Sequence, residues 1–219
     1  MPSPHIRAVI FDLDGTLADS LADIGGAMND TLRDRGWPEH SHDEYKQFVG
    51  EGIEVLVTKA SPPMSDVLLK EVVTQYRAHY AERADRNTRP YAGIPEMLDG
   101  LAALPLPIAV LSNKRDDFTR GLVQRVFPKW AFAQVRGERV GVPRKPDPTA
   151  ALEMARELGL QPGEIAFVGD TPIDVRTALS AGMKSVAVTW GFRGEEELRG
   201  AGAVNVIHRP LELLPLLAT

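Results

Sequence analysis

The stretch Phe11-Asp12-Leu13-Asp14-Gly15-Thr16-Leu17 directly follows the apolar run Ala8-Val9-Ile10. This run is short, apolar and bounded by Gly15, which predicts a buried β-strand. Open α/β sheets bind ligands at the C-terminal ends of their strands, and two carboxylates stand at that end here. Because successive strand residues point to opposite faces, we expect Asp12 and Asp14 to share a face. Two carboxylates on one face repel each other unless a cation or a shared proton relieves them, and Mg²⁺ is suited to do so.

The composition is that of an ordinary globular protein. The chain has 219 residues, of which 43% are hydrophobic and 25% charged, so it can form one large or two small domains. Its formal net charge of −5 argues against nucleic-acid binding. We see no apolar run of membrane-span length and no signal-peptide pattern in residues 1–11. The absence of cysteine excludes disulfides and thiolate metal sites and is compatible with a cytoplasmic location.

A long helical region follows the first strand. Leu17, Leu21, Ile24, Met28 and Leu32 recur at helical spacing and predict one apolar helix face. No strand pattern interrupts residues 18–85, which predicts a helical domain inserted into the rest of the chain. We expect its helices at about 17–35, 42–49, 52–60 and 64–84.

The remaining chain alternates strands with helices. We expect strands near 108–111, 131–135, 165–168, 185–189 and 204–207. Helices are expected at about 95–103 and 116–126, and in stretches ending near 158 and 181. This alternation predicts a doubly wound α/β fold with a mostly parallel sheet. The predicted division is a core of residues 1–17 and 86–219 and a helical domain of residues 18–85.

Three further polar clusters lie where distant segments can meet. Ser112-Asn113-Lys114 ends one strand, Lys145 lies in a proline-rich loop, and Gly169-Asp170 with Asp174 ends another strand. Taken singly, Ser112 could be an N-cap, Lys145 a solvated cation and Asp174 a helix cap. Because they follow one another in order along the chain, each after or near a predicted strand, we favour roles in one shared site over these separate structural roles.

Together with Asp12-Leu13-Asp14-Gly15-Thr16-Leu17, these clusters resemble the four ordered motifs of the haloacid dehalogenase superfamily. The resemblance implies a Rossmann-like core with a helical cap over residues 18–85. Within the superfamily the chain most resembles the phosphoglycolate phosphatases and their relatives. That narrower match rests on Asp19-Ser20, Val49-Gly50-Glu51-Gly52, Ser112-Asn113-Lys114 and Thr189-Trp190-Gly191-Phe192-Arg193.

The resemblance and the residue chemistry together suggest catalytic roles. Asp12 matches the nucleophile, which would form an aspartyl-phosphate, and Asp14 could act as general acid and then base. Asp12 and Asp170 would bind Mg²⁺ through their side chains, and the resemblance adds the backbone carbonyl of Asp14. Asp174 would either ligate the metal or hold the site by hydrogen bonding.

The phosphoryl group needs polar and cationic partners. Ser112 offers a hydroxyl, and Lys145 a compact charge that can offset Asp12 and the phosphate together. In capped relatives the loop matching Gly50-Glu51-Gly52 approaches the substrate. The predicted substrate contacts are Thr16, Gly50, Glu51, Ser112, Asn113 and Lys145.

The sequence therefore predicts a magnesium-dependent phosphatase acting on a small phosphorylated metabolite, with phosphoglycolate as the leading candidate. One alternative is a phosphomutase of the β-phosphoglucomutase type, and another is a non-catalytic binding module on the same fold. A dehalogenase is disfavoured, because it has no use for Asp14 as an acid or Asp170 as a ligand. The leaving alcohol and the oligomeric state stay open.

Overall fold

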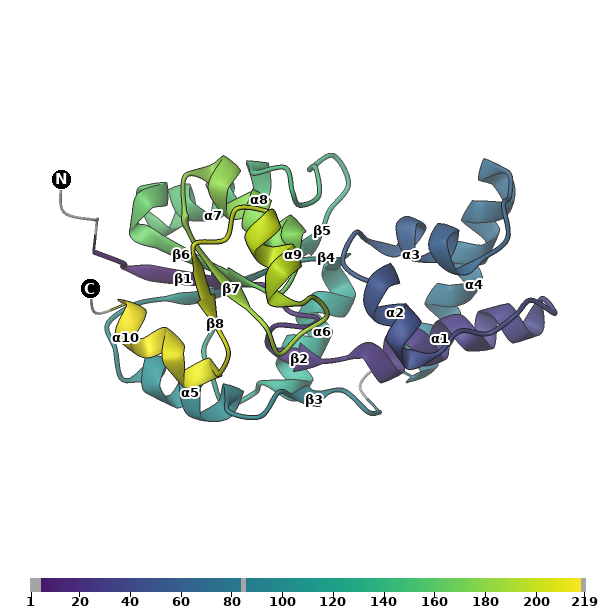
Figure 1. Ribbon diagram of the computed structural model, residues 1–219, viewed down its shortest axis with the longest axis horizontal. Coiled ribbons are helices and arrows are strands. Elements are labelled where there is room, and N and C mark those ends of the chain that lie inside the picture. Colours follow the sequence, from purple (N-terminus) through teal and green to yellow (C-terminus); the bar gives the residue numbers. More distant parts are fainter. Residues whose placement is uncertain (1–4, 84–85, 218–219) are drawn as a thin grey trace.

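Six parallel strands form the sheet at the centre of the computed structural model, which describes residues 5–83 and 86–217 (Figure 1). The strand order is β5-β4-β1-β6-β7-β8, so the first strand in the sequence is central and its neighbours come from distant segments. This confirms the predicted α/β fold with a parallel sheet. The bounds are β1 (Ala8–Phe11), β4 (Ile108–Arg115), β5 (Gln134–Glu138), β6 (Ile165–Gly169), β7 (Lys184–Val188) and β8 (Asn205–Ile207).

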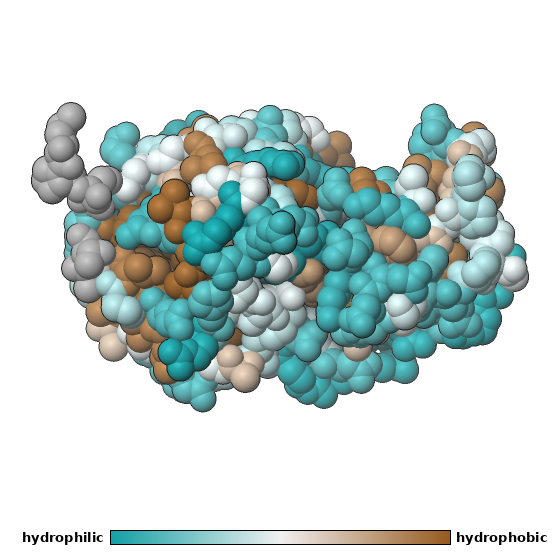
Figure 2. Space-filling model, in the orientation of Figure 1, coloured by the Kyte–Doolittle hydropathy of each residue, from teal (hydrophilic) through white to brown (hydrophobic). Residues whose placement is uncertain are grey.

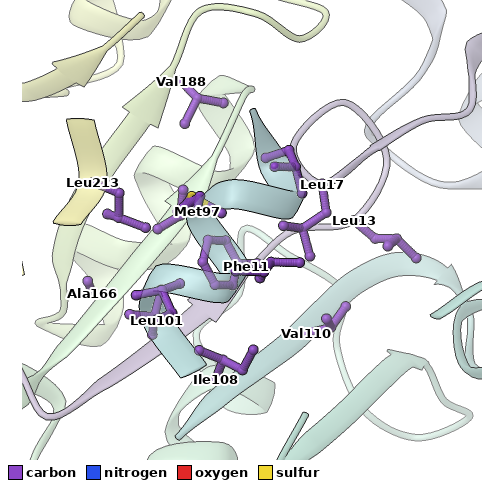
Figure 3. Close-up of a cluster of buried hydrophobic side chains, with 14 of the residues drawn as sticks. Phe11, Leu13, Leu17, Met97, Leu101, Ile108, Val110, Ala166, Val188 and Leu213 are labelled. Carbon is purple, nitrogen blue, oxygen red and sulfur yellow. The ribbon is translucent and has the colours of Figure 1, made fainter. Parts of the chain in front are cut away.

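Strand β1 is buried on both faces because helices cover both sides of the sheet. Val9 and Phe11 pack in the cluster beneath α5, α6 and α10, while Ala8 and Ile10 pack against α7 and α8 on the other face. Figure 3 shows Phe11 among side chains of β4 and α5. The helices are α5 (Ile94–Ala102), α6 (Asp116–Val126), α7 (Thr149–Leu158), α8 (Pro172–Ala181), α9 (Glu195–Gly200) and α10 (Leu213–Leu217). Short 3₁₀ helices span Pro162–Glu164 and Pro210–Glu212.

Four helices lie beyond the C-terminal ends of the strands and share a hydrophobic cluster of their own (Figure 1). They are α1 (Leu21–Asp34), α2 (His42–Phe48), α3 (Ile53–Ala60) and α4 (Asp66–Arg83). Leu21, Ile24, Met28 and Leu32 all face this cluster, as their spacing predicted. Phe192, from the segment after β7, also packs in it.

The chain passes between sheet and helices through a short strand pair. β2 (Ala18–Asp19) is antiparallel to β3 (Arg89–Pro90). The expectation of no strand within 18–85 is therefore wrong at its first residues. Helix α1 begins at Leu21 rather than Leu17, because Leu17 belongs to a turn and packs fully buried in the sheet cluster. The predicted helix end at 84 and domain boundary at 85 lie outside the described residues.

The buried carboxylate of Asp23 links the two chain segments that connect the sheet to the helices. Asp23, in the first turn of α1, accepts hydrogen bonds from the backbone N–H groups of Asn87 and Thr88 and from both their side chains, at 2.7–3.2 Å. Burial raises the pKa of Asp23, but these hydrogen bonds outweigh it and leave the pKa below its usual value. The first helix of the helical region, α1, is thus hydrogen-bonded directly to residues 87–88, which follow the last helix, α4.

Two strands differ from the predicted ranges for physical reasons. β5 runs over 134–138 rather than 131–135, because its buried Arg136 pairs with Glu153 and Glu157 on α7 and makes the strand look polar in sequence. β4 continues past Leu111 to Arg115, with an irregular register against β5. Ser112, Asn113 and Lys114 therefore belong to the strand itself.

Among the described residues, no helix has both the length and the apolar character needed to cross a membrane. Figure 2 shows mainly hydrophilic residues over the four helices at the right, with hydrophobic residues gathered toward the left end of the sheet region.

Candidate active site

Three carboxylates from two adjacent strand ends form a buried acidic cluster. Asp12 follows β1, Asp170 follows β6, and Asp174 lies in the first turn of α8. Because Phe11 pairs with Val168 across the two strands, Asp12 and Asp170 arrive side by side. One oxygen from each carboxylate lies within 4.8 Å of the others. The three residues are only 7%, 0% and 2% exposed.

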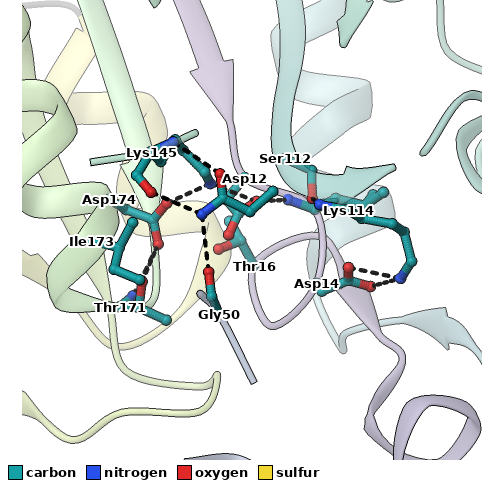
Figure 4. Close-up of polar contacts among 12 residues, drawn as sticks. Asp12, Asp14, Thr16, Gly50, Ser112, Lys114, Lys145, Thr171, Ile173 and Asp174 are labelled. Carbon is teal, nitrogen blue, oxygen red and sulfur yellow. Dashed lines mark hydrogen bonds and ion pairs between the residues drawn. The ribbon is translucent and has the colours of Figure 1, made fainter. Parts of the chain in front are cut away.

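Lys145 bridges two members of this acidic cluster (Figure 4). Its Nζ lies 2.8 Å from Asp12 Oδ1 and 2.7 Å from Asp174 Oδ1. Burial lowers the pKa of Lys145, but the two carboxylates outweigh burial and raise it, so the ammonium stays charged. The proline-rich loop therefore delivers a buried counter-charge rather than a solvated lysine.

Neighbouring groups fix the other carboxylates. Asp170 accepts hydrogen bonds from Thr16 Oγ1 at 3.0 Å and from the backbone N–H of Phe192 at 2.8 Å. Asp174 accepts from the N–H and hydroxyl of Thr171 with the oxygen that does not face Lys145. Asp174 thus caps its own helix and binds Lys145 at once.

The acidic cluster carries more negative than positive charge. Burial, together with the charge of Asp174, raises the pKa of Asp12 to about 7 despite the opposing effect of Lys145. Burial and the two neighbouring carboxylates also raise the pKa of Asp170 well above its usual range. Three carboxylates face one ammonium, and oxygen donors of this kind suit a hard divalent cation. The donor set therefore fits Mg²⁺.

A glycine makes this close approach possible. Gly15 has φ +89°, and a Cβ there would lie 2.2 Å from Asp170 Oδ2. A side chain at this position would therefore be strained and would displace the carboxylate.

Asp14 points away from the acidic cluster toward a second lysine (Figure 4). Lys114 Nζ lies 2.6 and 2.7 Å from its two oxygens, and Ser20 Oγ donates to Oδ1. The same ammonium lies 5.0 Å from the ring centroid of Tyr80 on α4. Asp12 and Asp14 thus line one cavity but bind different lysines, because the strand ends at Phe11 and the chain then turns.

Asn113 joins three segments near the acidic cluster. Its Nδ2 donates to the carbonyls of Gly50 at 3.1 Å and Lys145 at 3.0 Å, and its Oδ1 accepts from the N–H of Lys145 at 2.9 Å. Ser112 is buried in the cavity wall, where its hydroxyl accepts from the N–H of Lys114. Asn113 therefore positions the Lys145 loop and the Gly50 segment together.

The predicted site residues fall into two adjoining groups, with Glu51 outside both. Asp12, Asp14, Gly50, Ser112 and Asn113 line the cavity. Asp170, Asp174 and Lys145 form the acidic cluster around Asp12. Glu51 is exposed and pairs with Lys59 at 2.6 Å, and it is not among the residues that line the cavity. Thr16 lies beneath Asp170 as its hydrogen-bond donor. Gly50 does line the cavity, beside Ser112 and Asn113.

The cavity has walls that sequence reasoning did not assign. Lys114 is the most buried of the cations that line the cavity, and it had no role of its own in the prediction from sequence. The available signal was its place beside Ser112 at a strand end. Apolar walls come from the four helices and α6, and these residues look like ordinary core positions in sequence. They are Ile24, Val49, Ile53, Leu56, Tyr76, Tyr80 and Phe118.

Comparison with known proteins agrees with this geometry. Residues 9–188 match the family model of haloacid dehalogenase-like hydrolases. The chain is 33% identical to a phosphoglycolate phosphatase of Aquifex aeolicus over 85% of this chain and 86% of that protein. It is 32% identical to one of Chromobacterium violaceum, over 96% and 97%.

Solved structures share the fold at similar coverage. A predicted phosphoglycolate phosphatase from Haemophilus somnus has a TM-score of 0.89 at 26% identity, covering 96% of this chain and 97% of that one. A haloacid dehalogenase-like family hydrolase from Streptococcus pneumoniae has a TM-score of 0.88 at 25% identity, covering 99% of each. The family and the relatives indicate a phosphoric monoester hydrolase. This chain belongs to the haloacid dehalogenase-like hydrolases.

Proposed function

We propose that this hydrolase is a magnesium-dependent phosphatase that cleaves a small phosphate monoester through an aspartyl-phosphate on Asp12. The observation that carries the proposal is the acidic cluster of Asp12, Asp170 and Asp174 with Lys145 between two of its members. Mg²⁺ held by Asp12 and Asp170 would supply positive charge that offsets the phosphoryl oxygens. Asp174 would keep Lys145 and Thr171 in place.

The first half-reaction needs a nucleophile and an acid. An Asp12 oxygen attacks phosphorus, the bond from phosphorus to the leaving oxygen breaks, and Asp14 gives that oxygen a proton. Lys145 and the hydroxyl of Ser112 stabilise the charge on the transferred group. To reach the leaving oxygen, the Asp14 carboxylate turns away from Lys114.

The second half-reaction restores the enzyme. Asp14 takes a proton from water, which attacks phosphorus and breaks its bond to Asp12. Inorganic phosphate leaves, and Asp12 is a free carboxylate again. Under this proposal the four helices of residues 18–85 act as a cap that covers the site and keeps bulk water out.

Phosphoglycolate is the proposed substrate. The named relatives are phosphoglycolate phosphatases. Support also comes from the cavity, which Lys114, Arg77 and Arg115 line together with Asp12. Cations opposite the phosphoryl site suit a leaving group that carries a carboxylate.

A panel of phosphate esters tests the proposal. Phosphate release would be measured with Mg²⁺ and with excess chelator, using phosphoglycolate, ethyl phosphate, p-nitrophenyl phosphate and glucose 1-phosphate. We expect Mg²⁺-dependent release, fastest from phosphoglycolate and absent in Asp12→Asn. Conversion of glucose 1-phosphate without phosphate release would instead support the mutase. Full activity in chelator would reject the metal assignment.

A further inference from the structure

The short segment Trp190-Gly191-Phe192-Arg193, here called the connecting segment, contacts both the acidic cluster and the helical region. Arg193 is 8% exposed, although it belongs to a loop after β7. Its guanidinium donates to the carbonyl of Lys46, to that of Gln47 at 3.3 Å and to that of Val49 at 3.2 Å. Its Nε also pairs with Glu197 at 3.2 Å.

These carbonyls lie at and just beyond the end of α2. The last carbonyls of a helix have no partner within the helix, and a cation is favoured beside them. Arg193 therefore caps α2 from the sheet side of the molecule. A buried guanidinium needs its hydrogen bonds, so the contact is expensive to break.

The other end of the connecting segment is pressed against the acidic cluster. The N–H of Phe192 donates to Asp170 Oδ2 at 2.8 Å, and Trp190 Nε1 donates to the carbonyl of Thr16 at 2.9 Å. A Cβ on Gly191 would lie 2.2 Å from the carbonyl oxygen of Gly15 and 2.4 Å from Asp170 Oδ2. Only glycine lets the backbone pass this close.

The backbone that Arg193 holds continues directly into the cavity wall. Val49 accepts from Arg193, and the next carbonyl, that of Gly50, accepts from Asn113 at 3.1 Å. Gly50 also lies beside Thr171, whose Cγ2 would be 3.5 Å from a Cβ there. The Val49–Gly50 segment is thus bound on one side by the connecting segment and on the other by the residue that positions Lys145.

We propose that Arg193 is a positioning residue that keeps the Val49–Gly50 segment over the phosphoryl site. The connecting segment would link the position of the Val49–Gly50 segment to that of Asp170. Its kinetic consequence rests on the proposed phosphatase function. Without Arg193 the free enzyme spends less time with the segment in place. Substrate binding must then supply the ordering, so the apparent affinity falls in proportion to the competent fraction.

Kinetics of Arg193→Gln test the proposal. We expect KM for the best phosphomonoester to rise about tenfold while kcat stays within about threefold, because saturating substrate restores the closed arrangement. Arg193→Lys, which keeps a charged donor, should recover part of the loss. Glu197→Gln is the matched control, since it removes the ion pair but leaves the three carbonyl contacts, and its KM should stay within about twofold of wild type.

Other outcomes would overturn the proposal. A purely structural role would reduce the amount of active enzyme, lowering kcat and melting temperature with KM unchanged. An equal KM change in Glu197→Gln would assign the effect to the ion pair instead.

A second measurement does not depend on activity. The chain lacks cysteine, so exposed His42 and Glu196 can be replaced by cysteine and labelled as a pair across α2 and α9. Arg193→Gln should broaden the distribution of distances between the two labels or shift it to longer distances. An unchanged distribution would show that Arg193 does not position the Val49–Gly50 segment. If wild type releases phosphate from no ester with Mg²⁺, the proposed function fails, while the labelled pair still decides the structural claim.

Discussion

Lys114 donates to both carboxylate oxygens of Asp14, a residue one hundred positions earlier, and the two side chains are 10% and 11% exposed. Because of this ion pair, Asp12 and Asp14 have different charged partners although they are two residues apart. Asp12 faces Lys145 and the acidic cluster, while Asp14 faces a cation in the part of the cavity where a leaving group would lie. Under the proposed mechanism, Lys114 would lose this partner when Asp14 turns to the leaving oxygen, and a carboxylate on the substrate would replace it.

We predict that Lys114→Met will change substrate preference. A hydrogen bond to a charged group contributes about 1.5–3 kcal/mol, which corresponds to roughly a 10- to 150-fold loss. The ratio of kcat/KM for phosphoglycolate to that for ethyl phosphate, which lacks the carboxylate, should fall by about this factor. Equal losses on both esters would mean that Lys114 only orients Asp14. Arg77→Met is the comparison, and a larger fall there would assign the carboxylate to α4.

Asp12→Asn should abolish turnover without unfolding the protein. An amide is a far poorer nucleophile, and replacing one of three buried carboxylates removes repulsion with Asp174. We therefore expect phosphate release to fall at least about 10³-fold. The melting temperature in chelator should be no lower than that of wild type. Activity within tenfold of wild type would exclude Asp12 as the nucleophile.

Mg²⁺ should stabilise the folded protein, because it binds the native acidic cluster and not the unfolded chain. The melting temperature of wild type should rise with Mg²⁺ concentration, and Asp170→Asn should remove most of that rise. Asp99→Asn, which changes an exposed carboxylate on α5, is the control and should keep the rise. A rise of the same size in Asp170→Asn would contradict the assignment.

Ca²⁺ should bind the acidic cluster but inhibit phosphate release, because it takes more ligands at longer distances.

Asp23 should make stability depend on pH. Its folded pKa is below the unfolded value of about 3.9, so its contribution is complete above that value and is lost as pH falls through the folded pKa. Asp23→Asn should therefore destabilise the protein near neutral pH, by roughly 1–3 kcal/mol. The difference from wild type should shrink below about pH 4. Urea unfolding at pH 7 and pH 3 measures it, and a difference that is the same at both would disprove the role.

The sequence predicted those parts of the molecule in which local pattern and tertiary packing agree. The apolar run of β1 and the apolar face of α1 from Leu21 onward are of this kind. The strand predicted at 131–135 was placed a few residues too early, because the charge of Arg136 makes the stretch look polar and is neutralised by glutamates on a different element. Leu17 matched a helix face but packs with the sheet, and spacing alone cannot tell two cores apart.

The candidate site divides in the same way. Carboxylates at or just after strand ends can be recognised in the sequence, so Asp12, Asp170 and Asp174 could be predicted to lie close together. The partner of Asp14 could not, because the pairing with Lys114 depends on how the turn after β1 meets the extension of β4. Leu56 on α3 and Tyr76 on α4 look like ordinary core residues in the sequence, and only the packing of these two helices brings them to the cavity.

The strand pair β2–β3 has a consequence for how such a chain can diversify. Ala18 pairs with Pro90 and Asp19 with Arg89, so the chain leaves and re-enters the sheet region at neighbouring points. The residues between these two points therefore form an insertion whose two ends lie side by side. Strands β1, β4 and β6 all lie outside this insertion, so the register of the central sheet is formed without any of its residues. Under the proposed function, changes within the insertion would alter selectivity for the leaving group while Asp12 and Asp170 keep their places at the strand ends.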